Sequence, residues 1–182
     1  MHDFGEGIAR KNQMNPSVID SLASHAIHSS SQLFLLFRQQ KTYYAVELTS
    51  VREVLSLNNQ PINPVPNTPA FMLGLTNLRG DILAVADLGM LIGTEGQVDW
   101  HSLDSRLLIV EAPHPEDSNA TKIRMGLAVS QVEGVISLKP DRIVSAMDVN
   151  EEIAPFLRGL CHYETRLLMI LDVEAISMSD RW

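Results

Sequence analysis

The chain has 182 residues, of which 45% are hydrophobic and only 5% aromatic, and its formal net charge is −8. This length allows one domain or two small ones that share a core, and the composition requires that core to be aliphatic. The negative charge argues against a nucleic-acid partner and, more weakly, against docking on an anionic membrane surface. Cys161 is the single cysteine and cannot form an internal disulfide, so we expect a cytoplasmic protein.

Residues 1–31 are rich in Ser, Asn, Gln and His, which predicts an N-terminal tail that is partly helical. The stretch Pro16–His28 has some helical spacing, and it could be a transient helix or a helix that docks on the body or on a partner. His25 and His28 have the i, i+3 spacing of a helical metal pair, but no third ligand lies near them, so no metal site is predicted. The first residues lack the apolar segment of a secretory signal, and no window approaches the roughly 18 apolar residues of a membrane span.

Short apolar runs predict strands in the first half of the body, and polar or proline-rich segments separate them. These strands are expected at residues 33–38, 43–48, 51–57, 72–78 and 82–86. The loop 58–70 carries four prolines, which exclude both helix and ladder pairing and leave it stiff enough for a recognition surface. Alternation along the third run places Val51, Glu53 and Leu55 on one face. Asp87 is expected to cap a short helix that ends at Gly93.

The second half follows a polar linker at residues 94–105 and repeats the strand plan of the first. Its strands are expected at residues 106–111, 125–129, 132–138, 156–161 and 167–171, with a terminal helix at 172–178. Residues 44–57 align without gaps to 125–138, and residues 74–91 align to 159–176. Each half has about five short strands, too few to bury a core alone, so we expect two small barrels joined by an apolar seam.

Several motifs in this order resemble the CheW family, the scaffold proteins of bacterial chemotaxis arrays and related type IV pilus pathways. They are the strand Val51–Val54, the loop Pro64–Asn67, Gly74, the turn Asn77–Gly80, the strand that runs to Asp87–Leu88, and the repeat in the second half. The resemblance implies a mainly β fold of two packed SH3-like five-stranded barrels with short helices. It spans residues 32–178, with the first barrel at about 32–93 and the second at about 106–171.

The same resemblance implies a non-catalytic adaptor without cofactors. Its partners would be the regulatory domain of a CheA-type histidine kinase and the cytoplasmic tip of a chemoreceptor, in chemotaxis or in a pilus pathway. By position, the partner-binding residues of the family fall on Val51, Glu53, Val54, Gly74 and Arg79.

The residues themselves leave several alternatives open. Arg79 could anchor its turn by bonding backbone carbonyls, or it could meet a carboxylate of a partner, and Glu53 could simply face solvent. Asp87 and Asp172 could be read as a catalytic carboxylate pair, but their equivalent places in the two repeats favour helix capping. Cys161 reads as a buried, inert thiol.

Two other functions compete with the adaptor. A small-molecule-binding barrel or a hydrolase would need a pocket with convergent polar groups, for example around Asp87 or His162, and the sequence shows no such cluster. Because Cys161 and His162 are adjacent on a strand, their side chains should point to opposite faces and form no catalytic pair. The chain could also be the regulatory piece of a larger signalling protein, although little sequence follows the repeat.

Overall fold

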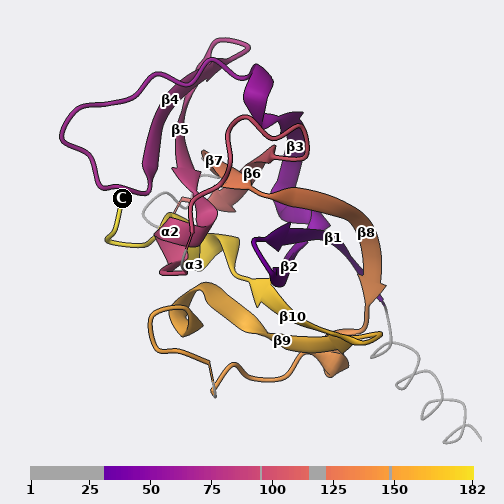
Figure 1. Cartoon of the computed structure of the whole chain (residues 1–182). Coiled ribbons are helices and arrows are strands. Elements are labelled where there is room, and N and C mark those ends of the chain that lie inside the picture. The colour runs from indigo at the N-terminus through magenta and orange to yellow at the C-terminus, as the bar shows by residue number, and fades with distance from the viewer. Residues whose placement is uncertain (1–30, 95, 115–121, 148) are drawn as a thin grey trace, which may run out of the picture. The chain divides into compact units, whose positions relative to one another are not determined.

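Ten β-strands make up the framework of the fold in a computed structural model that describes residues 31–94, 96–114, 122–147 and 149–182 (Figure 1). The tail predicted at residues 1–31, with its candidate helix and the pair His25 and His28, lies outside the described residues apart from Ser31. The strands fall into two five-stranded sheets, which we call barrel A and barrel B. The mainly β fold expected from the sequence is therefore confirmed.

Each sheet has a defined strand order. Barrel A runs β8 (Gln131–Leu138), β1 (Gln32–Gln39), β2 (Thr42–Glu47), β10 (Arg166–Leu171) and β9 (Leu157–Tyr163). Barrel B runs β3 (Val51–Ser56), β6 (Arg106–Pro113), β7 (Lys122–Val129), β5 (Asp81–Asp87) and β4 (Met72–Leu78). The short helices are α2 (Leu88–Ile92), α3 (Val173–Ser177) and the 3₁₀ turns η1 (Leu48–Ser50), η2 (Leu57–Asn59), η3 (Pro140–Arg142) and η4 (Ala154–Phe156).

The two barrels do not follow the two halves of the sequence. The hairpin β1–β2 of the first half lies in barrel A, where β2 pairs in parallel with β10. The hairpin β6–β7 of the second half lies in barrel B, where β7 pairs in parallel with β5. The expected barrels at 32–93 and 106–171 thus differ from those observed. The repeat predicts where the strands lie. It does not predict which sheet a hairpin joins, because the two sheets have the same strand plan and either one can accept the hairpin.

The internal repeat itself is visible in the hydrogen bonds. Asp87 caps α2 by accepting from the Met90 amide at 3.1 Å, and Asp172 caps α3 by accepting from the Ala175 amide at 3.0 Å. α2 ends at Gly93, which has a left-handed φ of 86°. Both predicted caps, and the predicted end of the first helix, are confirmed.

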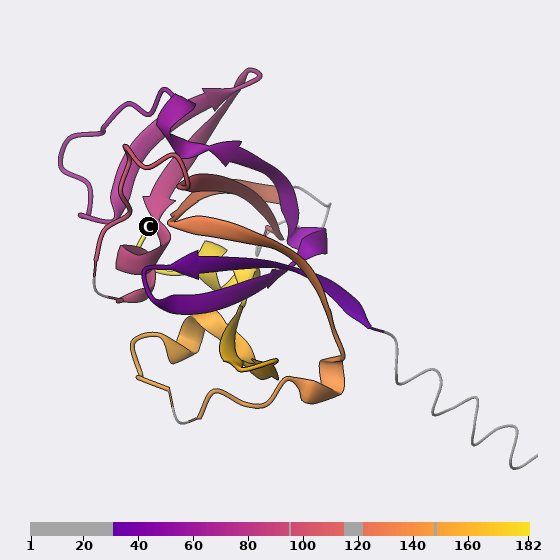
Figure 2. The ribbon, with the colours of Figure 1, turned by 45° about the vertical axis from the view of Figure 1, so that its right-hand side comes forward.

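Three apolar clusters account for the packing. Alternate side chains of β1 and of β6 belong to different clusters. In β1, Phe34 and Leu36 face the interior of barrel A, whereas Leu35 and Phe37 face a larger cluster between the barrels. In β6, Leu107 and Ile109 enter barrel B, and Leu108 and Val110 enter the cluster between the barrels. That central cluster also contains Leu88, Leu91 and Ile92 of α2 and Val173 and Ile176 of α3. The predicted apolar seam is therefore present, and Figure 2 shows the two barrels on either side of it.

The proline-rich loop covers the open edge of β4. Asn63 pairs with Leu75 through two backbone hydrogen bonds, of 2.8 and 2.9 Å, so the loop does make a short ladder contact between Pro61 and Pro64. This close approach requires a glycine at position 74. A Cβ placed there would lie 2.2 Å from the Asn63 carbonyl oxygen, and the φ of Gly74 is +142°. The loop was predicted to exclude any ladder pairing, and this single bridge corrects that.

We predict that Gly74→Ala destabilises the fold more than Gly134→Ala. Both glycines have positive φ, +142° and +147°, but no atom lies within 4 Å of a Cβ at Gly134. Backbone strain costs of the order of 1–3 kcal/mol at either position, and displacing the covering loop should add about 1–3 kcal/mol at Gly74 alone. Urea unfolding of the two variants measures the difference. Equal losses would show that the loop does not hold this edge.

Candidate partner-binding site at the mouth of barrel B

A tight turn presents Arg79 at one end of barrel B. The turn between β4 and β5 consists of Arg79 and Gly80, whose φ angles of 53° and 97° are the left-handed values that two-residue hairpin turns need. Asn77 stabilises the turn, because its Oδ1 accepts a hydrogen bond of 2.9 Å from the Gly80 amide. The Arg79 side chain is 77% exposed, so the turn carries a positive charge outward.

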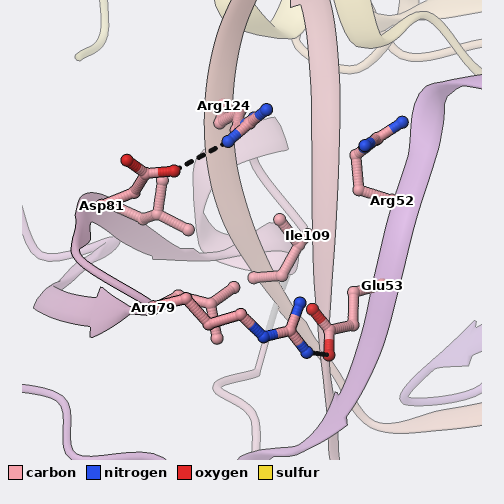
Figure 3. Close-up of a pocket in the computed structure, with 8 residues that line it drawn as sticks. Arg52, Glu53, Arg79, Asp81, Ile109 and Arg124 are labelled. Carbon is pink, nitrogen blue, oxygen red and sulfur yellow. Dashed lines mark hydrogen bonds and ion pairs between the residues drawn. The ribbon is translucent and has the colours of Figure 1, made fainter.

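The Arg79 guanidinium bonds a carboxylate from a different strand. Its Nη2 donates to Glu53 Oε1 at 2.8 Å, which joins the β4–β5 turn to β3 (Figure 3). Glu53 does not simply face solvent, since its side chain is only 25% exposed. The described hydrogen bonds show neither of the alternatives left open for Arg79, because its guanidinium bonds a carboxylate of this same chain.

This ion pair borders a small pocket of about 140 Å³. Figure 3 shows Arg79 and Glu53 on one side of it, with Arg124 directed toward Asp81 on the other. Leu83 and Ile109 belong to the interior cluster of barrel B and give the pocket an apolar lining. The full lining is Arg52, Glu53, Leu78, Arg79, Asp81, Leu83, Ile109 and Arg124.

A second charged group extends from this mouth across the sheet. The nearly buried carboxylate of Glu111 accepts from Arg124 Nε at 2.6 Å and from Lys122 Nζ at 3.3 Å, and Arg52 Nε lies 3.3 Å away. Burial acts to raise the pKa of Glu111, but the two hydrogen bonds and the charge of Arg52 outweigh it, so the pKa lies below its ordinary value of 4.5. Sequence reasoning missed these residues, because the register of β3, β6 and β7 brings them together.

The remaining candidates on β3 point in different directions. The pairing of β3 with β6 shifts between Val51 and Glu53, so the strand does not keep the simple alternation predicted for it. Val51 packs against the cluster between the barrels, whereas Leu55 packs against the interior of barrel B. The expectation that they share one face with Glu53 is therefore wrong. Val54 is 39% exposed and could contact a partner directly.

Gly74 is buried within β4 and lies against the covering loop. Its position explains why no side chain fits there, and it gives Gly74 no surface with which to touch a partner. The structure thus brings Glu53 and Arg79 together, leaves Val54 exposed on the same strand, and places Val51 and Gly74 in packing roles.

A polar groove of about 370 Å³ lies between the barrels. Arg158 of β9 and Glu47 of β2 both line it and form an ion pair, with Nη1 and Oε2 2.6 Å apart. Ser50, next to Val51, also lines it, so Val51 lies beside the groove rather than at the mouth of barrel B. The full lining is Glu47, Ser50, Glu111, Ala112, Pro113, Arg158, Leu171, Asp172, Val173 and Glu174.

Asp87, one of the candidate catalytic residues, is held by hydrogen bonds in the interior of the protein. Asp87 is fully buried, with Oδ2 accepting from the Val98 amide at 2.6 Å and Oδ1 from Gln39 Nε2 at 3.3 Å in addition to its cap bond. Burial raises its pKa, although three backbone amides act in the opposite direction. Asp87 lines neither the barrel-mouth pocket nor the inter-barrel groove.

Cys161 and His162 form no pair in the structure. Cys161 is buried in barrel A and its pKa is raised by that burial, whereas His162 is exposed. Among the described residues, no group of three or more His, Cys, Asp or Glu side chains is placed to hold a metal ion. In the same part of the chain, no helix is long and apolar enough to cross a membrane.

We predict that Glu111→Gln lowers the free energy of unfolding by about 1–3 kcal/mol at pH 7, because the variant leaves three cations without their shared carboxylate. A lowered pKa in the folded state means that the Glu111 charge stabilises the fold above about pH 4.5, and that this contribution disappears as the pH falls through the folded-state pKa. The difference between wild type and variant should therefore shrink in urea unfolding below pH 4.

Wild type and variant both contain Asp87, whose raised pKa gives the opposite pH trend, so the comparison cancels it. Glu151→Gln removes one charge from an exposed site and serves as the control. A difference for Glu111→Gln that stays constant from pH 7 to pH 4 would contradict the role assigned to this carboxylate.

Comparison with known proteins now identifies the family. The CheW-like domain matches residues 33–181. Chemotaxis protein CheW of Klebsiella aerogenes is 26% identical over 165 residues, covering 90% of each chain, and a probable chemotaxis protein CheW of Rhizobium etli is 24% identical, covering 86% of this chain and 94% of its own. The crystal structure of the scaffolding protein TtCheW from Thermoanaerobacter tengcongensis has the same fold, with a TM-score of 0.70, 24% identity, and coverage of 84% of this chain and 97% of its own. The chain, with its paired SH3-like barrels, belongs to the CheW family.

Proposed function

We propose that this chain is a cytoplasmic adaptor that binds both a chemoreceptor and a CheA-type histidine kinase, and so couples the state of one to the state of the other. Membership of the CheW family makes the protein a non-catalytic chemotaxis adaptor. The choice of partners, the cytoplasmic location and the pathway, swimming chemotaxis or type IV pilus signalling, are the proposed part. The observation that carries the proposal is the Arg79–Glu53 pair at an exposed barrel mouth.

The mouth of barrel B suits a protein partner better than a small molecule. Its pocket of about 140 Å³ is smaller than the roughly 300 Å³ at which ligand sites begin, and its charges already have partners. Around it lie exposed groups that a flat protein surface could contact, namely Arg79 and Val54. We assign the regulatory domain of the kinase to this mouth, with the carboxylate of Glu53 holding Arg79 in place.

The groove between the barrels is assigned to the receptor. It is larger and more polar than the pocket at the mouth of barrel B, and elements of both barrels line it. A helical hairpin tip laid there would contact β2, β6 and the start of α3 at once. The affinity for the receptor would therefore depend on how the two barrels are packed against each other. An adaptor needs such a dependence in order to transmit the state of a receptor.

The competing enzyme hypothesis has little support in the geometry. Asp87 is fully occupied by hydrogen bonds at the junction of α2, β1 and the Val98 segment, and Asp172 caps α3. His162 lies on the exposed face of β9 and lines neither the barrel-mouth pocket nor the groove. Each candidate acid or base thus has a structural role or stands apart from the concave sites described here.

We predict that Arg79→Ala weakens binding to the kinase regulatory domain at least about tenfold, which corresponds to about 1.4 kcal/mol, while leaving the receptor interaction unchanged. An exposed ion pair contributes only about 0–1 kcal/mol to stability, so the variant should unfold close to wild type. Calorimetric titrations of each partner fragment separately measure both affinities. Arg142→Ala, which removes an exposed arginine beyond β8, is the matched control.

Glu53→Ala and the double variant complete the test. If Glu53 acts only by holding Arg79, the double variant binds the kinase as weakly as Arg79→Ala alone. Unchanged kinase affinity in all three variants would overturn the assignment of this mouth, and additive losses would show that Glu53 contacts the kinase itself.

A further inference from the structure

The internal repeat gives the fold two equivalent junctions between the barrels. At one junction Asp87 precedes α2, and at the other Asp172 precedes α3. The strands β1 and β6 correspond as well, since β1 pairs with β2, β6 pairs with β7, and β2 corresponds to β7 in the repeat. The registers of these pairs place Gln39, at the end of β1, at the position that Ala112 has in β6. The two junctions can therefore be compared residue by residue.

A glutamine side chain is buried at the Asp87 junction. Gln39 is only 2% exposed, and its carboxamide forms hydrogen bonds through both of its polar atoms. Oε1 accepts from the Ser130 amide at 3.2 Å, and Nε2 donates to Asp87 Oδ1 at 3.3 Å. Ser130 is the residue between β7 of barrel B and β8 of barrel A. One neutral side chain thus connects the crossing between the barrels to the cap of α2.

Gly89 of α2 makes room for this glutamine. A Cβ placed on Gly89 would lie 2.7 Å from Gln39 Nε2, which is closer than side chains can pack. The Asp87 junction therefore combines a long side chain on the strand with no side chain on the helix.

The Asp172 junction has the opposite combination. Ala112 is at the position of Gln39, and Glu174 of α3 is at the position of Gly89. Ala112, Glu174 and Asp172 all line the groove of about 370 Å³ between the barrels. Because the side chain of Ala112 ends at Cβ, it does not extend to Asp172 as Gln39 extends to Asp87. The groove is open in the region that a carboxamide fills at the other junction.

The polar groups of the groove determine which side chain suits this open region. Among the described residues, Asp172 accepts one hydrogen bond, the cap bond of 3.0 Å from the Ala175 amide to Oδ1, so Oδ2 can accept from a further donor. Arg158 is already paired with Glu47. A carboxylate would be repelled by Asp172 and Glu174, and an apolar side chain would leave Oδ2 without a partner. A carboxamide provides the donor and adds an acceptor of its own.

We propose that this groove receives a glutamine or asparagine side chain of the receptor tip, which donates to Asp172 in the place that Gln39 occupies at the other junction. The small side chain of Ala112 leaves that place free, so Ala112 determines whether the groove can accept a partner. The inference deepens the proposed function and rests on its assignment of the groove to the receptor.

The first test rebuilds the filled junction in the groove. In the double variant Ala112→Gln with Glu174→Gly, the glutamine of the chain itself should occupy the groove. A receptor cytoplasmic-tip fragment should then bind at least about tenfold more weakly, while the affinity for the kinase regulatory domain stays unchanged. Glu174→Gly alone is the matched control, because it leaves the groove open and should bind the receptor as wild type does. Circular dichroism checks that each variant has the native fold.

The second test changes only the acceptor. Asp172→Asn can still cap α3, because asparagine caps about as well as aspartate, but it replaces Oδ2 by an amide nitrogen that accepts no hydrogen bond. The receptor affinity should fall at least about tenfold, whereas Asp141→Asn, at an exposed site outside the groove, should leave it unchanged. Alanine substitution of each glutamine and asparagine of the receptor fragment should identify one whose loss does not add to that of Asp172→Asn.

The titrations separate failure of this inference from failure of the proposed function. If wild type binds the receptor fragment, then a double variant that binds it as tightly as Glu174→Gly would overturn the inference alone. Full receptor affinity of Asp172→Asn, or coupling of Asp172 to a lysine or arginine of the receptor, would also overturn it. Wild type that binds no receptor fragment would contradict the proposed function itself, and the inference would fail with it.

Discussion

The structure depends on the exchange of hairpins between the two halves of the repeat. β2 pairs in parallel with β10, and β7 pairs in parallel with β5, so neither barrel is complete without strands from both halves. Two parallel neighbouring strands cannot be joined by a tight turn, so the strands of each parallel pair have to lie far apart in the sequence. The same exchange brings one face of β1 and one face of β6 against the cluster between the barrels, together with α2 and α3.

The candidate site follows from that arrangement. Glu53 is on β3 and Arg79 is in the turn after β4, but Glu111, Arg124 and Lys122 come from the hairpin that the second half contributes. The mouth of barrel B is thus built by both halves, and so is the groove that Glu47 and Arg158 line. An adaptor assembled in this way has surfaces whose shape depends on the seam between the barrels, and under the proposed function that seam would connect the receptor contact to the kinase contact.

Local features of the chain were predictable from the sequence. The caps at Asp87 and Asp172, the stop at Gly93 and the Arg79–Gly80 turn each depend on a few neighbouring residues, and all are observed. Non-local features were not predictable. The exchange of hairpins depends on which of two similar sheets a strand joins, and the irregular pairing around Arg52 depends on the register against β6. The Glu53–Arg79 pair was predicted only as two separate residues, because sequence spacing of 26 positions says nothing about contact.

The central claim, that each barrel needs strands from both halves, can be measured by cutting the chain in the linker after Gly96. We expect fragments 1–96 and 97–182 to show no cooperative unfolding when separate, because each lacks strands of both sheets. Mixed and refolded together, they should recover the circular dichroism and the cooperative urea transition of the intact chain. A fragment that unfolds cooperatively on its own would show that one half closes a barrel without the other, and the account would be wrong.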